Sequence, residues 1–216
     1  MRGMVIGKIL ASKSPSFSTG NYVTCTPGWT ELSILDSKEV TLLEVPSNGR
    51  VTDALGVLGS TGLTAYFGMT DIGQVKAGDF VVVSGAAGAT GSVACQIAKL
   101  KGAKVLGLAG SDEKVAWLKE LGCDDALNYK DPEFTQKFKG ATKDLIDVFF
   151  DNVGGEILEA ALSRAKAHAR FVMCGAISQY NVAQPKGPKV AYLPYSQILA
   201  KANRFAEHLN GDCPAH

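Results

Sequence analysis

The sequence carries almost no net charge. Its 22 lysine and arginine residues stand against 21 aspartate and glutamate residues, which leaves a formal charge of +1 at pH 7. Proteins that follow a nucleic-acid backbone or a charged membrane surface need a field of one sign. The balance therefore predicts small-molecule chemistry, with no nucleic-acid partner and no membrane partner.

Long apolar stretches are also lacking. No apolar run reaches the roughly 18 residues of a membrane-spanning helix, and the first residues have no extended apolar centre like that of a secretory signal. With 46% apolar residues, the composition is that of an ordinary globular protein. We therefore expect a cytoplasmic protein with a substantial core.

Cysteine is too sparse and too scattered to build a framework. The five cysteines, Cys25, Cys95, Cys123, Cys174 and Cys213, are an odd number and include no C-x-x-C pair. Disulfide scaffolds and structural zinc sites need paired, closely spaced cysteines. We expect free thiols, no metal site, and Cys95 and Cys123 as small core residues.

The amino-terminal part has the pattern of short β-strands. Runs of β-branched and aromatic residues, separated by Ser, Pro, Gly and Asn, predict part of an all-β lobe. These runs are Val5–Leu10, Tyr22–Thr24, Trp29–Leu35 and Val40–Val45. From Thr52 to about Gly73 the pattern is helical and rich in glycine, which predicts short helices between two domains.

From Phe80 onward, apolar strands alternate with helical segments. This alternation predicts an α/β fold with a doubly wound parallel sheet, and unbroken apolar runs such as Phe80–Val83 suit strands buried on both faces. Strands are expected at Phe80–Ser84, Val105–Ala109, Ala126–Asn128, Ile146–Phe150 and Arg170–Cys174, and helices at Gly91–Leu100, Asp112–Leu121, Glu133–Lys139 and Glu156–Ala165. A further helical segment is expected from Tyr195 to about Phe205, followed by an irregular tail.

A glycine-rich turn joins the first of these strands to the first helix. Relative to the dinucleotide fingerprint G-x-G-x-x-G, Ala86 replaces the first glycine, while Gly88 and Gly91 take the second and third places. Such a turn aims backbone N–H groups and the positive end of a helix at a diphosphate. The sequence predicts a nicotinamide-dinucleotide site with its pyrophosphate between Gly85 and Gly91. The alternative is a turn without a ligand.

The end of the second strand predicts which dinucleotide binds. In NAD-binding proteins an acidic residue here binds the ribose 2′-hydroxyl. Here Ala109 is followed by Gly110, Ser111, Asp112, Glu113 and Lys114. Small residues and a lysine leave room and a cation for a 2′-phosphate, which favours NADPH, although Asp112 favours NAD. Alternatively, Ser111 only caps the helix, the acidic residues complement its dipole, and Lys114 is a solvated charge.

Two further loops follow strands at the carboxyl edge of the sheet, where ligands bind in this fold. Asn152 and the pair Gly154-Gly155 follow the fourth strand, and Gly175–Tyr180 follow the fifth. The nicotinamide end is expected here. The other interpretation of Asn152 is a turn residue ahead of Gly154.

Six segments together carry a resemblance to a known family. They are Gly62–Gly68, Ser84–Ser92, Gly110–Lys114, Asn128–Lys130, Asp151–Gly155 and Cys174–Tyr180. With them the sequence resembles, from about Gly3 to Arg204, the medium-chain dehydrogenase/reductase superfamily in its zinc-independent branch. That branch contains leukotriene B4 12-hydroxydehydrogenase, prostaglandin reductase and alkenal double-bond reductases. The resemblance implies a partial GroES-like catalytic lobe at 1–50, interdomain helices at 51–78, a Rossmann domain at 79–205 and an irregular tail at 206–216.

The resemblance also implies roles for individual residues. NADPH would be the cofactor, with its pyrophosphate at Gly88, Ala89, Thr90 and Gly91, its 2′-phosphate at Lys114 and its adenosine near Tyr129. The residues expected toward the nicotinamide are Thr64, Asn152, Cys174, Gly175, Ala176, Ile177, Ser178, Gln179 and Tyr180.

The reaction implied is reduction of the carbon–carbon double bond of an α,β-unsaturated aldehyde or ketone. Hydride passes from NADPH to the β-carbon and a proton reaches the α-carbon. The enolate oxygen needs a hydrogen-bond donor, for which Tyr180 and Tyr195 are the candidates; each is otherwise a packing or adenine-side tyrosine. Conjugate reduction does not require a Lewis acid, which fits the lack of the zinc-bearing lobe of other superfamily members.

The sequence also departs from the family pattern. Met1 falls inside the catalytic lobe, and the residues after Arg204 are unlike the family, so we expect a reductase shortened at both ends. An NADPH:quinone reductase and a truncated nucleotide-binding protein without turnover are the alternatives. A homodimer is a further expectation, and the sequence does not indicate which enal, enone or quinone is preferred.

Overall fold

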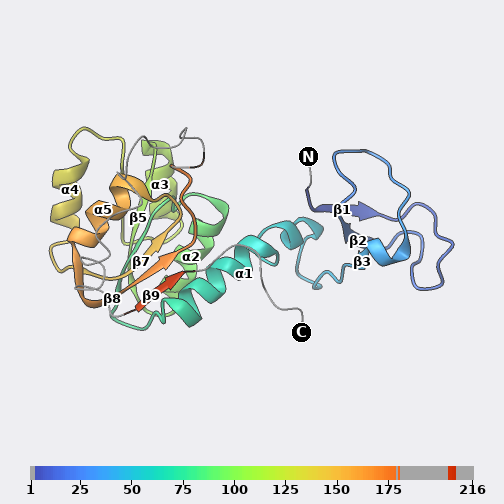
Figure 1. The fold of residues 1–216 in the computed structure, drawn as a ribbon, viewed down its shortest axis with the longest axis horizontal. Helices are drawn as coiled ribbons and strands as arrows, with labels where there is room; N and C mark the ends of the chain where they lie inside the picture. The colour runs from blue at the N-terminus through green and yellow to red at the C-terminus, as the bar shows by residue number, and fades with distance from the viewer. Residues whose placement is uncertain (1–2, 179, 181–203, 208–216) are drawn as a thin grey trace. The chain divides into compact units, whose positions relative to one another are not determined.

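The computed structural model describes residues 3–178, 180 and 204–207. The chain divides into two compact units, Met1–Leu63 and Thr64–His216 (Figure 1). The domain limits inferred from the sequence stay a prediction. None of the helices in the described part of the chain has the length and apolar character that a bilayer crossing requires.

The amino-terminal unit contains a three-stranded antiparallel sheet. Its strands are β1 (Val5–Lys8), β2 (Tyr22–Cys25) and β3 (Thr41–Leu42), with β2 in the middle. A 3-10 turn, η1 (Ser37–Glu39), precedes β3, and a second one, η2 (Val51–Leu55), follows it. Three of the four strands predicted in this region are therefore confirmed.

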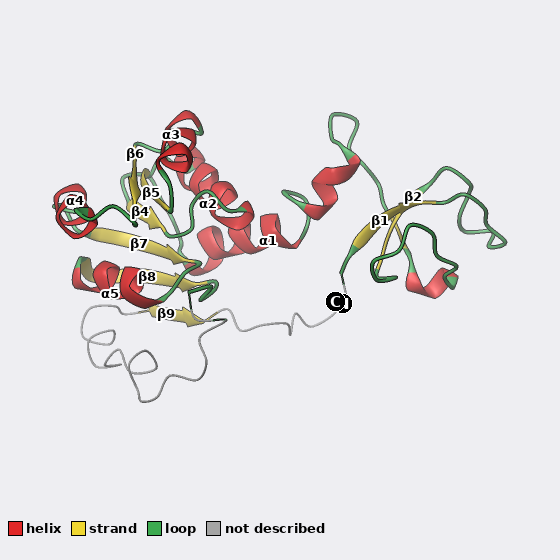
Figure 2. Cartoon of the chain, turned by 90° about the horizontal axis from the view of Figure 1, so that it is seen from above, coloured by secondary structure: helices red, strands yellow, loops and turns green. Residues whose placement is uncertain are grey.

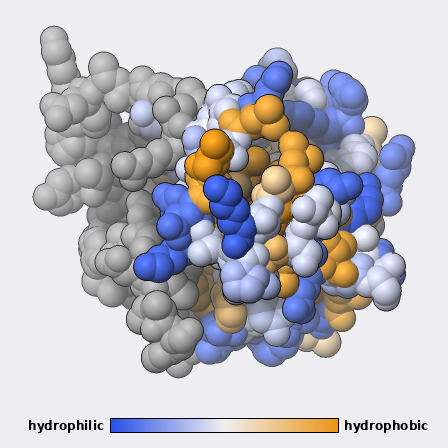
Figure 3. Space-filling model, turned by 90° about the vertical axis from the view of Figure 1, so that its right-hand side faces the viewer, coloured by the Kyte–Doolittle hydropathy of each residue, from blue (hydrophilic) through white to orange (hydrophobic). Residues whose placement is uncertain are grey.

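The prediction of a strand at Trp29–Leu35 is wrong. None of the described strands pairs with this segment. Instead, the Thr30 hydroxyl donates to the Leu32 carbonyl at 2.7 Å, a local bond that competes with a ladder. The side chain of Trp29 is 83% exposed, and Val23 is the one buried apolar side chain among the described residues of this unit. Figure 3 shows apolar groups reaching the surface on the face that it draws.

Short helices follow, as predicted for Thr52 to Gly73. Helix α1 (Ser60–Phe67) continues into a π-helical turn, η3 (Gly68–Ile72). Gly68 is buried, and a Cβ atom added there would lie 2.6 Å from the Phe150 ring. The helical backbone thus approaches the sheet at a distance that only glycine permits.

The second unit contains a six-stranded parallel sheet. Its strands are β4 (Phe80–Val83), β5 (Lys104–Ala109), β6 (Asp125–Asn128), β7 (Ile146–Asp151), β8 (Ala165–Met173) and β9 (Arg204–Glu207), in the order β6-β5-β4-β7-β8-β9. Its helices are α2 (Ala89–Leu100), α3 (Asp112–Glu120), α4 (Phe134–Ala141) and α5 (Gly155–Ser163). The order reverses between β4 and β7, which is the doubly wound arrangement expected.

Both faces of this sheet are buried. Val81, Val83 and Phe150 pack in one core with α2 and α3. Val82, Phe149 and Phe171 pack in another with α4 and α5. Figure 2 shows these helix pairs on opposite sides of the sheet. Successive strand residues point to opposite faces, so an unbroken apolar run fills both cores, as predicted.

The cysteines behave as small apolar residues. Cys95, on α2, and Cys123, which follows α3, are buried in the core on the α2 and α3 side of the sheet, as expected. All four cysteines in the described residues have free thiols, and Cys213 lies outside them.

The carboxyl-terminal part of the sheet corrects two expectations. Arg204 and Phe205 belong to strand β9, not to the end of a helix, and β9 extends through Ala206 and Glu207 into the expected tail. Backbone pairing with β8, in which Phe171 is opposite Phe205, overrides the local helical pattern. In addition, α5 ends at Ser163 and β8 already begins at Ala165, earlier than predicted.

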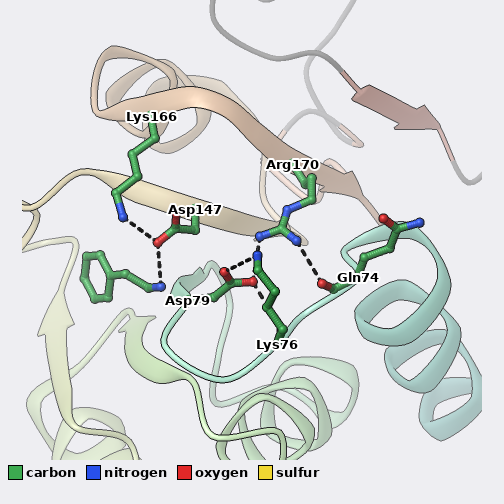
Figure 4. A network of polar contacts seen from close by, with 7 residues as sticks. Gln74, Lys76, Asp79, Asp147, Lys166 and Arg170 are labelled. Atoms are coloured by element: carbon green, nitrogen blue, oxygen red, sulfur yellow. Dashed lines mark hydrogen bonds and ion pairs between the residues drawn. The ribbon is translucent and has the colours of Figure 1, made fainter.

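An ionic network fixes the amino edge of the sheet (Figure 4). Arg170 of β8 contacts Asp79, just before β4, at 2.6 Å and donates to the Gln74 carbonyl at 2.8 Å. Lys76 donates to the other Asp79 oxygen at 2.8 Å. The Asp79 and Arg170 side chains are only 4% and 14% exposed, so little water screens this pair.

The same network changes the titration of Asp79. Burial raises the pKa of this carboxyl, but hydrogen bonds from Lys76 and Arg170 outweigh burial and hold the pKa below its ordinary value. A carboxyl whose pKa is lowered by folding stabilises the fold above its ordinary pKa. That contribution is lost as pH falls through the lowered value.

The turn between β4 and α2 is fixed by close backbone packing. A Cβ atom added to Gly91 would lie 2.3 Å from the Gly85 carbonyl oxygen and 2.8 Å from the Ala86 Cα. Gly85 itself has φ +57°, the left-handed region that favours glycine. The glycines are therefore required by the turn itself.

Replacing Arg170 with alanine is expected to lower the free energy of unfolding by about 3 kcal/mol, because it removes the buried partner of the Asp79 carboxylate and leaves only the exposed Lys76. Lys119→Ala is the control, since Lys119 and Asp125 form an exposed pair at 3.2 Å worth less than about 1 kcal/mol. Chemical unfolding at neutral pH measures both. Equal losses for the two variants would contradict the importance of burial.

Gly91→Ala is expected to lower the free energy of unfolding by about 2 kcal/mol, because backbone atoms must move. Gly140 in α4 has no atom within 4 Å of an added Cβ. Gly140→Ala is therefore expected to be neutral or to stabilise by up to about 1 kcal/mol through helix propensity. Thermal unfolding followed by circular dichroism compares them, and effects of the same sign and size would refute the packing explanation.

Candidate dinucleotide-binding site

A cleft opens at the carboxyl ends of β4, β5 and β7, next to the point where the strand order reverses. Its volume is about 310 Å³. The residues that line it are Gly85, Ala87, Gly88, Ala89, Thr90, Gly91, Ala109, Gly110, Lys114, Tyr129, Asn152, Val153 and Ile177. Lys114 is the one charged residue among them, so the cleft presents a single positive charge.

The amino end of α2 forms one wall of the cleft. The backbone N–H groups of Ala89, Thr90 and Gly91 have no hydrogen-bond acceptor among the residues that the structure describes. Gly88, which caps the helix, supplies no side chain to them. Three unused donors and the positive end of a twelve-residue helix make an anion-binding surface.

The turn after β5 forms a second wall. The Ser111 hydroxyl accepts from the Lys114 N–H at 3.4 Å and caps α3, as the sequence suggested. A Cβ atom added to Gly110 would lie 2.7 Å from the Tyr129 hydroxyl oxygen, so the tyrosine ring packs against bare backbone. Ser111 therefore caps α3 while Lys114 lines the cleft, so the two interpretations of this turn are compatible.

A buried carboxylate organises the third wall. Asp151, at the end of β7, accepts from the Ser84 hydroxyl at 2.6 Å and from the N–H groups of Val153 and Gly154, both at 3.0 Å. Burial raises the pKa of Asp151 despite these donors. The carboxylate thereby joins the end of β4 to the turn that follows β7.

Asn152 faces the cleft from this turn. Its side-chain N–H donates to the Ser84 carbonyl at 2.7 Å, and its backbone N–H donates to the Ser84 hydroxyl at 2.8 Å. No donor within the described ranges reaches its side-chain oxygen, Oδ1. That oxygen can therefore accept a hydrogen bond from a bound amide. The turn is formed and the side chain lines the cleft, so Asn152 has both features that the sequence suggested.

The loop after β8 folds over the same turn. The Ile177 N–H donates to the Asn152 carbonyl at 3.2 Å, and the Ser178 hydroxyl donates to the Val153 carbonyl at 2.6 Å. Ile177 reaches the cleft, whereas Cys174, Gly175, Ala176 and Ser178 support the loop without lining it. Ile177 and Asn152 therefore lie next to each other in the lining of the cleft.

Two further predicted residues do not line the cleft, and two others are not described by the structure. Tyr180 is 66% exposed, and its hydroxyl accepts from the Ala176 N–H at 3.1 Å, so its ring turns back onto its own loop. Thr64, on α1, does not line the cleft. Gln179 and Tyr195 lie outside the described residues. The catalytic role of either tyrosine stays a prediction.

Sequence reasoning gave no separate role to Ser84 and Asp151. Each ends an apolar strand with a polar residue, Phe80–Val83 before Ser84 and Ile146–Phe150 before Asp151, and both are fully buried. A buried polar residue needs a hydrogen-bond partner. Because both residues follow parallel strands at the same sheet edge, the sequence could have predicted that they bond to each other. Among the described residues, no cluster of His, Cys, Asp and Glu side chains could hold a metal ion.

Comparison with known proteins gives consistent matches. The family model described as zinc-binding dehydrogenase matches residues 89–207. Prostaglandin reductase 1 of Mus musculus is 47% identical over 203 residues, which cover 92% of this chain and 62% of that protein. The NADP(+)-dependent 2-alkenal reductase of Nicotiana tabacum is 39% identical over 86% of this chain and 54% of its own length.

A solved structure agrees with these relatives. The crystal structure of CurA in complex with NADPH from Vibrio vulnificus has a TM-score of 0.84 and 38% identity, and the match covers 93% of this chain and 60% of that one. The chain spans 54–62% of the length of the curated relatives described by these comparisons. The family inferred from the motifs is confirmed: this chain belongs to the zinc-binding dehydrogenase family, in the prostaglandin and alkenal reductase branch of the medium-chain dehydrogenase/reductase superfamily.

Proposed function

We propose that this chain binds NADPH and serves the reduction of the carbon–carbon double bond of an α,β-unsaturated aldehyde or ketone. The observation that carries the proposal is the cleft at the carboxyl edge of the sheet. It combines three unused N–H donors at the start of α2 with a single cation, Lys114. The NADPH complex of the Vibrio neighbour and the NADP-dependent alkenal reductase of tobacco support the choice of cofactor and reaction class.

The residues that line the cleft fit the successive parts of NADPH. A diphosphate suits the donors at Ala89, Thr90 and Gly91, where a Cβ atom on Gly91 would collide with the turn. Lys114 and the tyrosine ring over Gly110 suit a phosphorylated adenosine. The Asn152 Oδ1, which none of the described donors reaches, suits the carboxamide N–H of a nicotinamide.

When bound, NADPH supplies the hydride. This chain's residues would hold the nicotinamide end: the Asn152 side-chain oxygen would orient the nicotinamide carboxamide, and Ile177 would give that part of the cleft an apolar contact. The Tyr180 hydroxyl accepts from Ala176 and so keeps its own proton free to donate to a substrate carbonyl oxygen. Tyr195 is the other candidate for this donation. A homodimer, a cytoplasmic location and the individual roles of Thr64 and Cys174–Tyr180 stay predictions.

NADPH is expected to bind in preference to NADH, and Lys114→Ala should remove most of that preference, weakening NADPH about tenfold through loss of one charge-assisted contact. NADH binding should hardly change. Lys119→Ala, a lysine on the same helix paired with Asp125, should leave both affinities unchanged. Calorimetric titration measures these affinities. Failure of the unmodified chain to bind either nucleotide would overturn the proposal.

Tyr180→Phe is expected to lower kcat for NADPH oxidation with a short alkenal by about a hundredfold, as for loss of an oxyanion donor, with the affinity for NADPH unchanged. Tyr22→Phe, on β2, should have no effect. The rates are followed by NADPH absorbance, with a quinone assayed alongside. Faster turnover of the quinone would favour quinone reduction, and NADPH binding without turnover of either substrate would contradict the reductase assignment.

A further inference from the structure

One carboxylate lies close to the proposed phosphate site without taking part in it. Asp112 is in the first turn of α3, two residues before Lys114. In NAD-binding proteins an acidic side chain at this strand end binds the ribose 2′-hydroxyl, and it would repel a 2′-phosphate. Asp112 is nevertheless not one of the residues that line the cleft.

The carboxylate has a partner on the neighbouring strand. Asn128, the last residue of β6, donates from its side-chain N–H to Asp112 Oδ1 at 2.9 Å. Asn128 lies opposite Ala109 in the parallel register, so it adjoins the residue from which the Gly110 turn starts. The bond therefore crosses from β6 to the beginning of α3.

The orientation of the Asn128 amide is fixed by a second bond. Its side-chain oxygen accepts from the Lys130 N–H at 3.0 Å. Because the oxygen is engaged with a backbone donor, the amide nitrogen is the atom that faces Asp112. The side chain thus presents a donor, which a carboxylate needs, at a defined place.

We propose that Asn128 is a positioning residue that sets the preference for a 2′-phosphate, by holding the Asp112 carboxylate out of the cleft that Lys114 lines. This inference rests on the proposed function and adds to it the device by which an acidic residue at this turn is made compatible with NADPH. Without Asn128, the carboxylate is free to rotate toward the cleft. There it repels a phosphate and accepts a hydrogen bond from a ribose hydroxyl.

A purely structural brace makes different predictions. If the bond served only to fix α3, removing either partner would have the same effect on binding, and removing both would add nothing. If Asn128 restrains a harmful charge, removing Asp112 is harmless, and it cancels the effect of losing Asn128. A double-mutant cycle separates the two explanations.

The experiment titrates the full chain and its Asn128→Ala, Asp112→Ala and double variants with 2′,5′-ADP and 5′-AMP, which differ in the 2′-phosphate alone, and with NADPH and NADH. We expect Asn128→Ala to weaken 2′,5′-ADP and NADPH about tenfold while 5′-AMP and NADH bind equally well or better. Asp112→Ala alone should keep or improve the affinity for NADPH. The double variant should recover the affinity of the unmodified chain.

Three results would overturn the inference: an unchanged selectivity in Asn128→Ala, the same loss in Asp112→Ala, or no recovery in the double variant. If Asn128→Ala does not fold, Asn128→Leu replaces it, because it keeps the size of the side chain, adds no charge and lacks the N–H that Asp112 receives. An unmodified chain that binds NADPH selectively while the cycle fails sinks this inference alone. An unmodified chain that binds none of the four nucleotides sinks the proposed function with it.

Discussion

The candidate site depends above all on the buried Asp151 carboxylate. It accepts from Ser84, Val153 and Gly154, while its backbone carbonyl accepts from Cys174 and Gly175, both at 2.9 Å. One residue thus ties together the ends of β4, β7 and β8. Since burial raises its pKa, the folded protein binds its proton more tightly than the unfolded chain. Asp151 therefore lowers stability as pH rises from the ordinary aspartate pKa through the raised one. The ordered cleft wall offsets that cost.

Local pattern was sufficient wherever burial on both faces decides the structure. The unbroken apolar runs at Phe80–Val83 and Val148–Phe150 are short and are bounded by polar residues and glycine turns, which is typical of strands buried on both faces. The local pattern was insufficient where pairing with a strand distant in the sequence determines the structure. Trp29–Leu35 has strand-forming residues, but none of the strands in the described ranges pairs with it. Arg204–Phe205 follows a helical pattern, but pairing with the edge of β8 makes it part of β9. The sequence of a segment does not by itself show which strand it will pair with.

The same distinction applies to the site. Glycine spacing and strand ends indicated the α2 turn, Lys114 and Asn152, and the family resemblance added Tyr129. The structure brings all four to one cleft, because the fold brings the carboxyl ends of parallel strands to one edge. Side-chain direction could not be inferred in this way. Tyr180 belongs to the right loop yet bonds to Ala176, and the acidic residue at position 112, which favours NAD by its type, turns to Asn128 instead. The residue type shows which hydrogen bonds a side chain can make. The neighbouring groups in the fold determine whether that side chain faces the cleft.

The two edges of the sheet divide stability from binding. At the amino edge, the buried Asp79 carboxylate accepts from both Arg170 and Lys76, so its charge has partners within the described part of the chain. At the carboxyl edge, the first N–H groups of α2 have no acceptor among the described residues and Lys114 has a cleft before it. Unused hydrogen-bond donors cost a fold stability unless a ligand or water satisfies them. Among the described residues, the unused donors therefore lie at the edge for which NADPH binding is proposed, and the buried ion pair lies at the opposite edge.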